Sequence, residues 1–154
     1  MFRKAFIRRI LKGPAVLLKE MPMKQHTAGE DYLKTILILQ HERGTVRSVD
    51  VAGRLNVSKP SVSYAVTVLK ESKLLYVDDN MYLHLTDSGR EIAEQVYRRH
   101  CFFRDLLVDS GVSREAASAD ACRLEHAISE DSFQKLAKNL HEHNLADLPD
   151  CSSF

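Results

Sequence analysis

The stretch from 48 to 69 constrains the fold more than any other, because two short helical patterns lie there with only three residues between them. Apolar side chains recur at helical spacing in 48–55 and again in 59–69. Asn56 lies between them, and Asn tolerates the left-handed backbone that a tight turn requires. The sequence therefore predicts a helix-turn-helix.

The second helix of this pair has one apolar side and one polar side. Ser48 and Ser58 are typical N-cap residues for the two helices, and Pro60 near the second start needs no amide partner. The polar side offers hydroxyls, an aromatic ring and a cation, which suit base edges and phosphates. We expect base-edge or methyl contacts from Ser61, Ser63 and Tyr64, phosphate contacts from Ser48, Ser58 and Lys59, and a thymine-methyl contact from Pro60.

Two apolar runs, 74–77 and 81–85, follow the helix-turn-helix and flank the polar triplet 78–80. Such a pattern predicts a β-hairpin, so the whole segment reads as a winged helix-turn-helix. Some winged helices bind proteins instead of DNA. Residues 43–73 carry a net charge of +4, which favours DNA as the partner.

The rest of the chain is predicted to be helical, so the fold class is mainly α. Residues 27–40 form a first core helix with Thr27 as its cap, and a long helix runs from 86 through 107 until Gly111 stops it. Two more helices follow, over 113–128 and from 129 onward.

Cys122, Glu125 and His126 stand at spacings that place all three on one face of the predicted helix 113–128. A thiolate, a carboxylate and an imidazole together suit a first-row transition metal. The alternative is structural, because Cys is commonly a small core residue and a Glu-His pair commonly lies on a solvated face. Three ligands do not close a metal site, so other parts of the chain must supply the remainder.

The 154 residues suffice for one domain or two small ones with a real core. Three widely spaced cysteines argue against a disulfide framework and favour a reducing cytoplasm, and no apolar run is long enough to span a bilayer. Residues 1–20 carry a net charge of +5. We expect 1–26 to be a basic leader, disordered or dispensable, with the working protein starting near Met21 or Met23.

Five segments in register resemble the diphtheria-toxin-repressor family of metal-dependent transcriptional repressors. They are Gly29–Leu33, Val57–Ser63, Leu85–Gly89, Tyr97–His100 and Cys122–Ser129. The resemblance implies an N-terminal winged-helix DNA-binding domain, a helical dimerisation domain, and Fe(II) or Mn(II) as corepressor. It also implies a cytoplasmic homodimer that binds a palindromic operator and represses metal-uptake genes.

Carried over by position, the resemblance implies metal ligands at Asp31, His100, Cys122, Glu125 and His126. Two departures bear on the metal. Lys34 stands where the manganese branch has a second carboxylate, and Cys122 stands where the iron branch has Cys. Arg104 and Ser118 replace ligands of the ancillary site of the iron branch. One Fe(II) ion is therefore preferred, with Mn(II) as the alternative.

The resemblance gives a domain plan of leader 1–26, winged helix-turn-helix 27–88, metal-binding and dimerisation domain 89–143, and tail 144–154. The chain is similar in architecture to the short form without an SH3-like domain. Two other functions compete with this one. A metalloenzyme would need a vacant coordination position and a nucleophile motif, so no enzymatic activity is expected. A winged-helix transcription factor that does not sense metal would leave Cys122 and His126 as structural residues.

Overall fold

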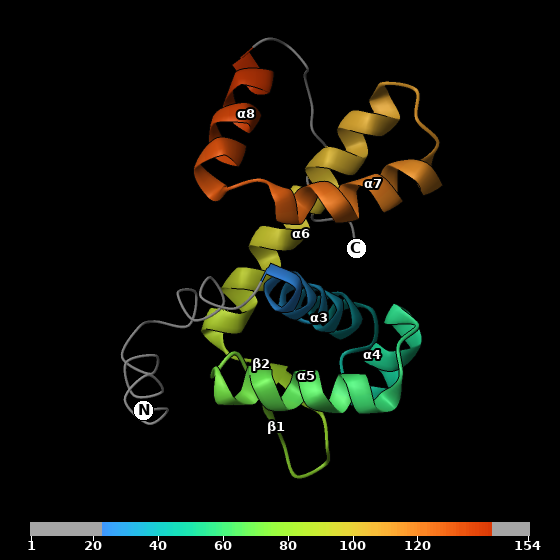
Figure 1. The fold of residues 1–154 in the computed structure, drawn as a ribbon, viewed down its shortest axis with the longest axis vertical. Helices are drawn as coiled ribbons and strands as arrows, with labels where there is room; N and C mark the ends of the chain where they lie inside the picture. The colour runs from blue at the N-terminus through green and yellow to red at the C-terminus, as the bar shows by residue number, and fades with distance from the viewer. Residues whose placement is uncertain (1–22, 143–154) are drawn as a thin grey trace. The chain divides into compact units, whose positions relative to one another are not determined.

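The computed structural model describes residues 23–142, with side chains for 27–140. Six helices and one hairpin make up this part of the chain (Figure 1): α3 Met23–Arg43, α4 Ser48–Leu55, α5 Lys59–Glu71, β1 Leu75–Val77, β2 Leu83–Leu85, α6 Asp87–Asp109, α7 Arg114–Ala127 and α8 Glu130–Glu142. The described residues divide into two compact units, the first ending at Glu94 and the second beginning at Gln95. The predicted fold class is confirmed. Of the predicted leader 1–26, residues 1–22 lie outside the described residues and 23–26 are the start of α3; the tail 144–154 also lies outside them.

The helix-turn-helix forms as predicted from α4 and α5. Asn56 between them adopts the left-handed conformation, with φ 53° and ψ 45°. The Ser58 hydroxyl accepts the amide hydrogen of Ser61 over 3.3 Å and so caps α5. Val62 and Leu69 bury the inner side of α5, which leaves its other side in solvent.

The predicted cap of α4 was wrong by one residue. Ser48 is the first residue of the helix, and Arg47 holds the cap position with an extended backbone. The Arg47 amide donates to Oδ2 of Asp50 over 2.8 Å, so a carboxylate inside the helix replaces the serine cap. The buried Val46 accepts a hydrogen bond from Leu83 of the hairpin over 2.8 Å. This pairing holds the chain extended up to the helix.

The hairpin pairs β1 and β2 antiparallel, with Leu75 opposite Leu85. Its strands are shorter than predicted because Asp78 organises a longer turn. The Asp78 carboxylate accepts the amide hydrogens of Asn80 and Tyr82, each over 2.9 Å. Gln40 donates to the carbonyl of Leu83 over 3.1 Å and helps cover the outer edge of β2.

Helix α3 is longer at both ends than the predicted 27–40. Met, Lys and Gln at its start favour helix, so Thr27 lies inside it instead of capping it. Gly44, with φ 79°, ends the helix and donates its amide hydrogen to Gln40 over 2.8 Å. The inner face of α3 supplies four fully buried side chains to the core of the first unit: Leu33, Ile36, Leu37 and Leu39.

Thr86 and Gly89 fix the start of α6 in the first unit. The Thr86 hydroxyl accepts the Gly89 amide hydrogen over 3.1 Å and donates to the carbonyl of Lys73 over 2.9 Å. A Cβ at Gly89 would lie 1.9 Å from the carbonyl oxygen of Leu74. Only glycine allows the helix to approach the chain that enters β1.

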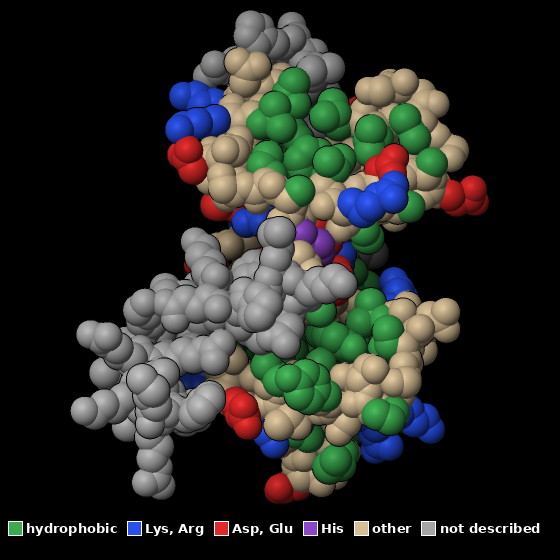
Figure 2. All heavy atoms as spheres, in the orientation of Figure 1, with side chains coloured by type: hydrophobic (Ala, Val, Ile, Leu, Met, Phe, Trp, Pro, Cys, Tyr) green, Lys and Arg blue, Asp and Glu red, His purple; other side chains and the backbone are tan. Residues whose placement is uncertain are grey.

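The second unit contains the rest of α6 with α7 and α8. Gly111, with φ 91°, follows the end of α6, and Ser113 caps α7 by accepting the amide hydrogen of Ala116 over 3.3 Å, both as predicted. Phe102, Phe103 and Phe133 pack as an aromatic cluster with Ala121. Hydrophobic side chains of this unit also gather at its surface beside α8 (Figure 2).

None of the helices within residues 23–142 combines the length and hydropathy that a membrane span requires.

Candidate metal centre and nucleic-acid interface

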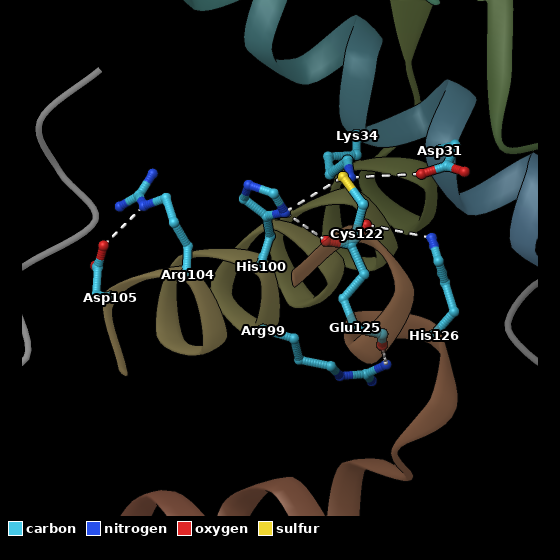
Figure 3. A network of polar contacts seen from close by, with 9 residues as sticks. All are labelled: Asp31, Lys34, Arg99, His100, Arg104, Asp105, Cys122, Glu125 and His126. Carbon is cyan, nitrogen blue, oxygen red and sulfur yellow. Dashed lines mark hydrogen bonds and ion pairs between the residues drawn. The ribbon is translucent and has the colours of Figure 1, made fainter. Parts of the chain in front are cut away.

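His100, Cys122 and Glu125 come together inside the second unit. Their ligand atoms all lie within 4.8 Å of one another. Nδ1 of His100, from α6, is 2.8 Å from Oε2 of Glu125 and 3.7 Å from Sγ of Cys122, both on α7 (Figure 3). The spacing along one helix face therefore predicted that Cys122 and Glu125 lie together. The third residue of the group, His100, comes from α6.

Glu125 is fully buried, with no side-chain surface exposed. Its Oε2 faces His100, while its Oε1 lies 3.2 Å from Nε2 of His126 (Figure 3). A buried carboxylate is costly unless it is paired and hydrogen-bonded. The two imidazoles supply that pairing, which overturns the solvated-face alternative for this Glu-His pair.

Arg99 fixes the ends of α7 and α8 beside this cluster. Its guanidinium donates to the backbone carbonyl of Glu125 over 3.2 Å and to Oε2 of Glu130 over 2.8 Å. Burial acts to raise the pKa of Glu130, but hydrogen bonds from Gln134 and Arg99 and the arginine charges outweigh it and lower the pKa. Sequence reasoning missed Arg99, because its partners lie 26 and 31 residues away.

Asp31 and Lys34 lie on α3 in the first unit. Lys34 Nζ is 3.4 Å from Oδ1 of Asp31, and the Lys34 side chain is only 8% exposed. Burial and the charge of Asp31 together raise the pKa of the neighbouring Tyr32 phenol. Because Asp31 belongs to the other unit, its share in a metal shell stays a prediction.

Arg104 keeps a positive charge on α6. Nε of Arg104 lies 2.7 Å from Oδ1 of Asp105, and this hydrogen bond raises the pKa of the guanidinium above its ordinary value. A permanent cation opposes a nearby metal ion. The absence of the ancillary site stays a prediction.

The cluster in the second unit fits a transition-metal ion by its donors. Cys122 Sγ is a soft ligand, the His100 imidazole is borderline, and the Glu125 carboxylate is hard, a mixture typical of first-row metals. The buried Glu125 carboxylate also supplies negative charge at the inner end of the group. These three residues, with His126 against Glu125, are candidates to hold the ion.

The predicted DNA-contacting residues line one side of the helix-turn-helix. Six of them are exposed, all around the turn and along the outer face of α5: Ser58, Lys59, Pro60, Ser61, Ser63 and Tyr64. Tyr64 is the most prominent of the aromatic residues here, at 66% exposed. Ser48 is half-buried at the start of α4.

Two family models match the chain one after the other. Residues 26–85 match the N-terminal DNA-binding domain of iron-dependent repressors. Residues 86–145 match the metal-binding and dimerisation domain of iron-dependent repressors. The two matches meet between the wing and α6.

Curated relatives agree with these matches. The iron-dependent repressor IdeR of Mycobacterium tuberculosis is 41% identical over 113 residues, which are 73% of this chain and 49% of IdeR. The transcriptional regulator MntR of Escherichia coli O157:H7 is 35% identical over 104 residues, 68% of this chain and 67% of MntR. The chain spans about half the length of the iron-dependent repressors it matches.

A solved structure of a manganese-dependent transcriptional repressor in complex with manganese has a TM-score of 0.65 to this chain at 32% identity. The likeness covers 73% of this chain and 52% of the other. The fold of both units is therefore that of known metal-responsive repressors.

Proposed function

Because the chain belongs to the iron-dependent repressor family, we propose that it is a metal-dependent DNA-binding repressor of metal-uptake genes. As a homodimer loaded with Fe(II) or Mn(II), it binds a palindromic operator. The observation that carries the proposal is the buried Glu125, flanked by His100 and Cys122, in the unit that follows a helix-turn-helix. The match to a metal-binding domain supports this function over a winged-helix factor that does not sense metal.

The DNA-binding part is proposed to use the exposed side of α5. Ser61, Ser63 and Tyr64 read base edges or methyl groups, and Pro60 touches a thymine methyl. The phosphate contacts come from Ser48, Ser58 and Lys59. The exposure of the α5 residues, in a segment whose net charge is positive, supports these roles.

The metal ligands are proposed to be Asp31, His100, Cys122, Glu125 and His126. A bound Fe(II) or Mn(II) would supply positive charge that favours the thiolate and carboxylate and gives residues of both units a common partner. Glu125 anchors the inner end of the group, held by Arg99 through its backbone carbonyl. Cys122 lies at the exposed end. Asp31, from α3, adds a ligand from the DNA-binding unit.

One ion per chain, with Fe(II) preferred over Mn(II), is proposed from Lys34 and Cys122. The ammonium of Lys34 beside Asp31 supplies a cation where a second metal would need a carboxylate. Changing Lys34→Glu is expected to raise the metal content of Mn(II)-saturated protein from about one ion toward two. Elemental analysis measures this, and an unchanged metal content contradicts the role given to Lys34.

The dimer is proposed to form through the second unit. Leu106, Leu136 and Leu140 are only partly buried against the aromatic cluster, so the single chain leaves apolar surface beside α8. Such surface is typical of an isologous interface between two copies. A symmetric dimer would present two copies of α5 to two half-sites of a palindrome.

The domain boundaries are proposed as 27–88 for DNA binding and 89–143 for metal binding and dimerisation. Segments 1–26 and 144–154 flank them. We propose a cytoplasmic regulator without enzymatic activity.

A titration of operator binding tests the function. An operator is selected from random duplexes with the metal-loaded protein, and its affinity is measured anaerobically with Fe(II), with Mn(II) and with chelator. We expect either metal to tighten binding by about 5- to 150-fold. A protein whose DNA affinity is the same with metal and with chelator would eliminate the sensor.

The Cys122→Ala variant tests the ligand set, and Cys101→Ala is its matched control. Cys101 is also on the second unit but is buried in the core, outside the cluster. We expect Cys122→Ala to lose most of the bound metal and of the response, and Cys101→Ala to keep both. A normal response of Cys122→Ala would remove Cys122 from the ligand set.

A further inference from the structure

Three arginines lie in α4 or just before it, and they differ in how their charge is neutralised. Arg54 forms two hydrogen bonds, each 3.0 Å, with the carboxylate of Glu42. Arg43 lies 3.4 Å from Oδ1 of Asp50. The guanidinium of Arg47 has no carboxylate partner within the described residues. Arg47 is exposed and therefore adds positive charge to the surface at the start of α4.

Arg47 is nevertheless held in place by an aromatic ring of the wing. Its guanidinium carbon lies 4.8 Å from the centre of the Tyr82 ring, and its Nη2 is 3.4 Å from the Tyr82 hydroxyl. Its backbone amide is bonded to Asp50. A guanidinium stacked on a ring keeps the N–H groups at its edge available to a second partner, and its order reduces the entropy lost on binding.

The tip of the wing is a poor partner for DNA phosphates, since it carries Asp78 and Asp79. A hydrogen bond from His84, joined by one from the Tyr82 amide, lowers the pKa of Asp78, so this group stays ionised at neutral pH. Two carboxylates repel a phosphate backbone. Tyr82 pairs with Asp78, whose amide donates to the Tyr82 carbonyl over 3.1 Å, and the guanidinium of Arg47 on the Tyr82 ring adds the opposite charge beside this turn.

We propose that Arg47, positioned by Tyr82, binds a backbone phosphate of the operator and thereby joins the wing to the helix-turn-helix in DNA binding. The proposal rests on the proposed function, because it adds a phosphate contact to the same DNA-binding unit. In helix-turn-helix proteins the first helix crosses the DNA backbone, and Arg47 caps that helix here. The contact positions the protein on the duplex without reading sequence.

Four variants test the contact: Arg47→Gln, Arg47→Lys, Tyr82→Leu and Tyr82→Phe. Their affinities for the selected operator and for an unrelated duplex are measured by fluorescence anisotropy at several salt concentrations, with Mn(II) present. Arg47→Gln is expected to weaken binding to both duplexes by about tenfold and to reduce the slope of log affinity against log salt by about one. Arg54→Gln is the matched control, because its charge is already paired with Glu42, and should keep the wild-type slope.

The other variants separate charge from positioning. Arg47→Lys and Tyr82→Leu should keep the salt slope but lose affinity several-fold, because the charge remains while its planar support is lost. Tyr82→Phe keeps the ring under the guanidinium and loses only the 3.4 Å contact of Nη2 with the hydroxyl, so its affinity should stay close to that of the wild type. Wild-type affinity and slope in Arg47→Gln would overturn the phosphate contact. Wild-type affinity in both Arg47→Lys and Tyr82→Leu would overturn the positioning by Tyr82.

These outcomes differ from failure of the proposed function. If wild-type protein binds DNA equally well with Mn(II) and with chelator, the metal sensor fails, but the effect of Arg47→Gln on the unrelated duplex still tests the phosphate contact. Metal content of every variant should match the wild type, because neither Arg47 nor Tyr82 is among the proposed metal ligands, and thermal unfolding identifies any variant that has lost stability.

Discussion

Arg99 supports the candidate metal centre, because it bonds both the backbone carbonyl of Glu125 and the carboxylate of Glu130. It is only 8% exposed, so its removal leaves buried polar groups without partners. We expect Arg99→Met to lower the free energy of unfolding by about 2–3 kcal/mol and to weaken metal affinity. Denaturant unfolding and metal titration measure the two effects.

The exposed neighbour Arg98 provides the control for this prediction. Arg98→Met makes the same change of side chain on the solvent side of α6 and should alter stability by no more than about 0.5 kcal/mol. Equal effects of the two substitutions would contradict the role assigned to Arg99.

Glu130 gives the ion pair with Arg99 a defined pH dependence. Its pKa is lowered in the folded protein, so the pair stabilises the fold above the pKa of an unfolded Glu, about 4.3, and the contribution is lost as the pH falls through the lowered value. Because Glu130 is 39% exposed, we expect Glu130→Gln to cost about 1 kcal/mol or less at pH 7. In thermal unfolding, the difference from wild type should persist above the unfolded pKa and vanish as the pH falls through the lowered pKa of Glu130. A difference that grows on acidification would reverse the assigned sign.

At the scale of the elements, the junction between the wing and α6 tolerates no side chain at Gly89. An added Cβ would overlap the carbonyl of Leu74, and backbone on both sides limits relief. Gly89→Ala should therefore lower the free energy of unfolding by about 3 kcal/mol or more. Gly53→Ala is the matched control, because a Cβ there meets nothing within 4 Å, and it should stabilise α4 by about 0.5–1 kcal/mol. Denaturant unfolding of both variants measures the two changes in the free energy of unfolding.

The elements that sequence predicts best are those whose signals are local. The turn at Asn56, the cap at Ser58 and the stop at Gly111 each depend on one residue and its immediate neighbours, and all three were predicted. Ser48 was misassigned because Asp50 accepts the Arg47 amide hydrogen and so starts α4 one residue earlier. The pairing of Val46 with Leu83, 37 positions away, also holds this segment extended, and such distant pairing leaves no local pattern.

The candidate metal centre likewise combines features that local sequence predicts with features that depend on distant packing. The spacing of Cys122 and Glu125 on one helix face was visible in the sequence, whereas burial of Glu125 and the approach of His100 depend on packing of α6 against α7. The family resemblance, not periodicity, supplied His100. The structure separates the two cysteines by burial, because Cys101 is buried and Cys122 is exposed. The sequence gives no equally strong distinction between them.

At the scale of the whole molecule, the proposed regulation requires that one ligand come from the DNA-binding unit. Asp31→Ala should weaken metal binding and abolish most of the metal-dependent gain in DNA affinity, because the remaining ligands all belong to the second unit. Parallel titrations of metal and of operator DNA measure both. Asp109→Ala, an exposed change at the end of α6, should leave both unchanged. A full metal effect in Asp31→Ala would show that this residue does not link the units.

The donors of the cluster lie at different depths: the Cys122 thiol is exposed, the His100 ring is 12% exposed and the Glu125 carboxylate is fully enclosed. If this cluster holds the proposed ion, an ion from bulk water would meet the Cys122 sulfur before the Glu125 oxygen. The exposed thiol would then bear mainly on how fast the ion binds, and the enclosed carboxylate on how long it stays bound.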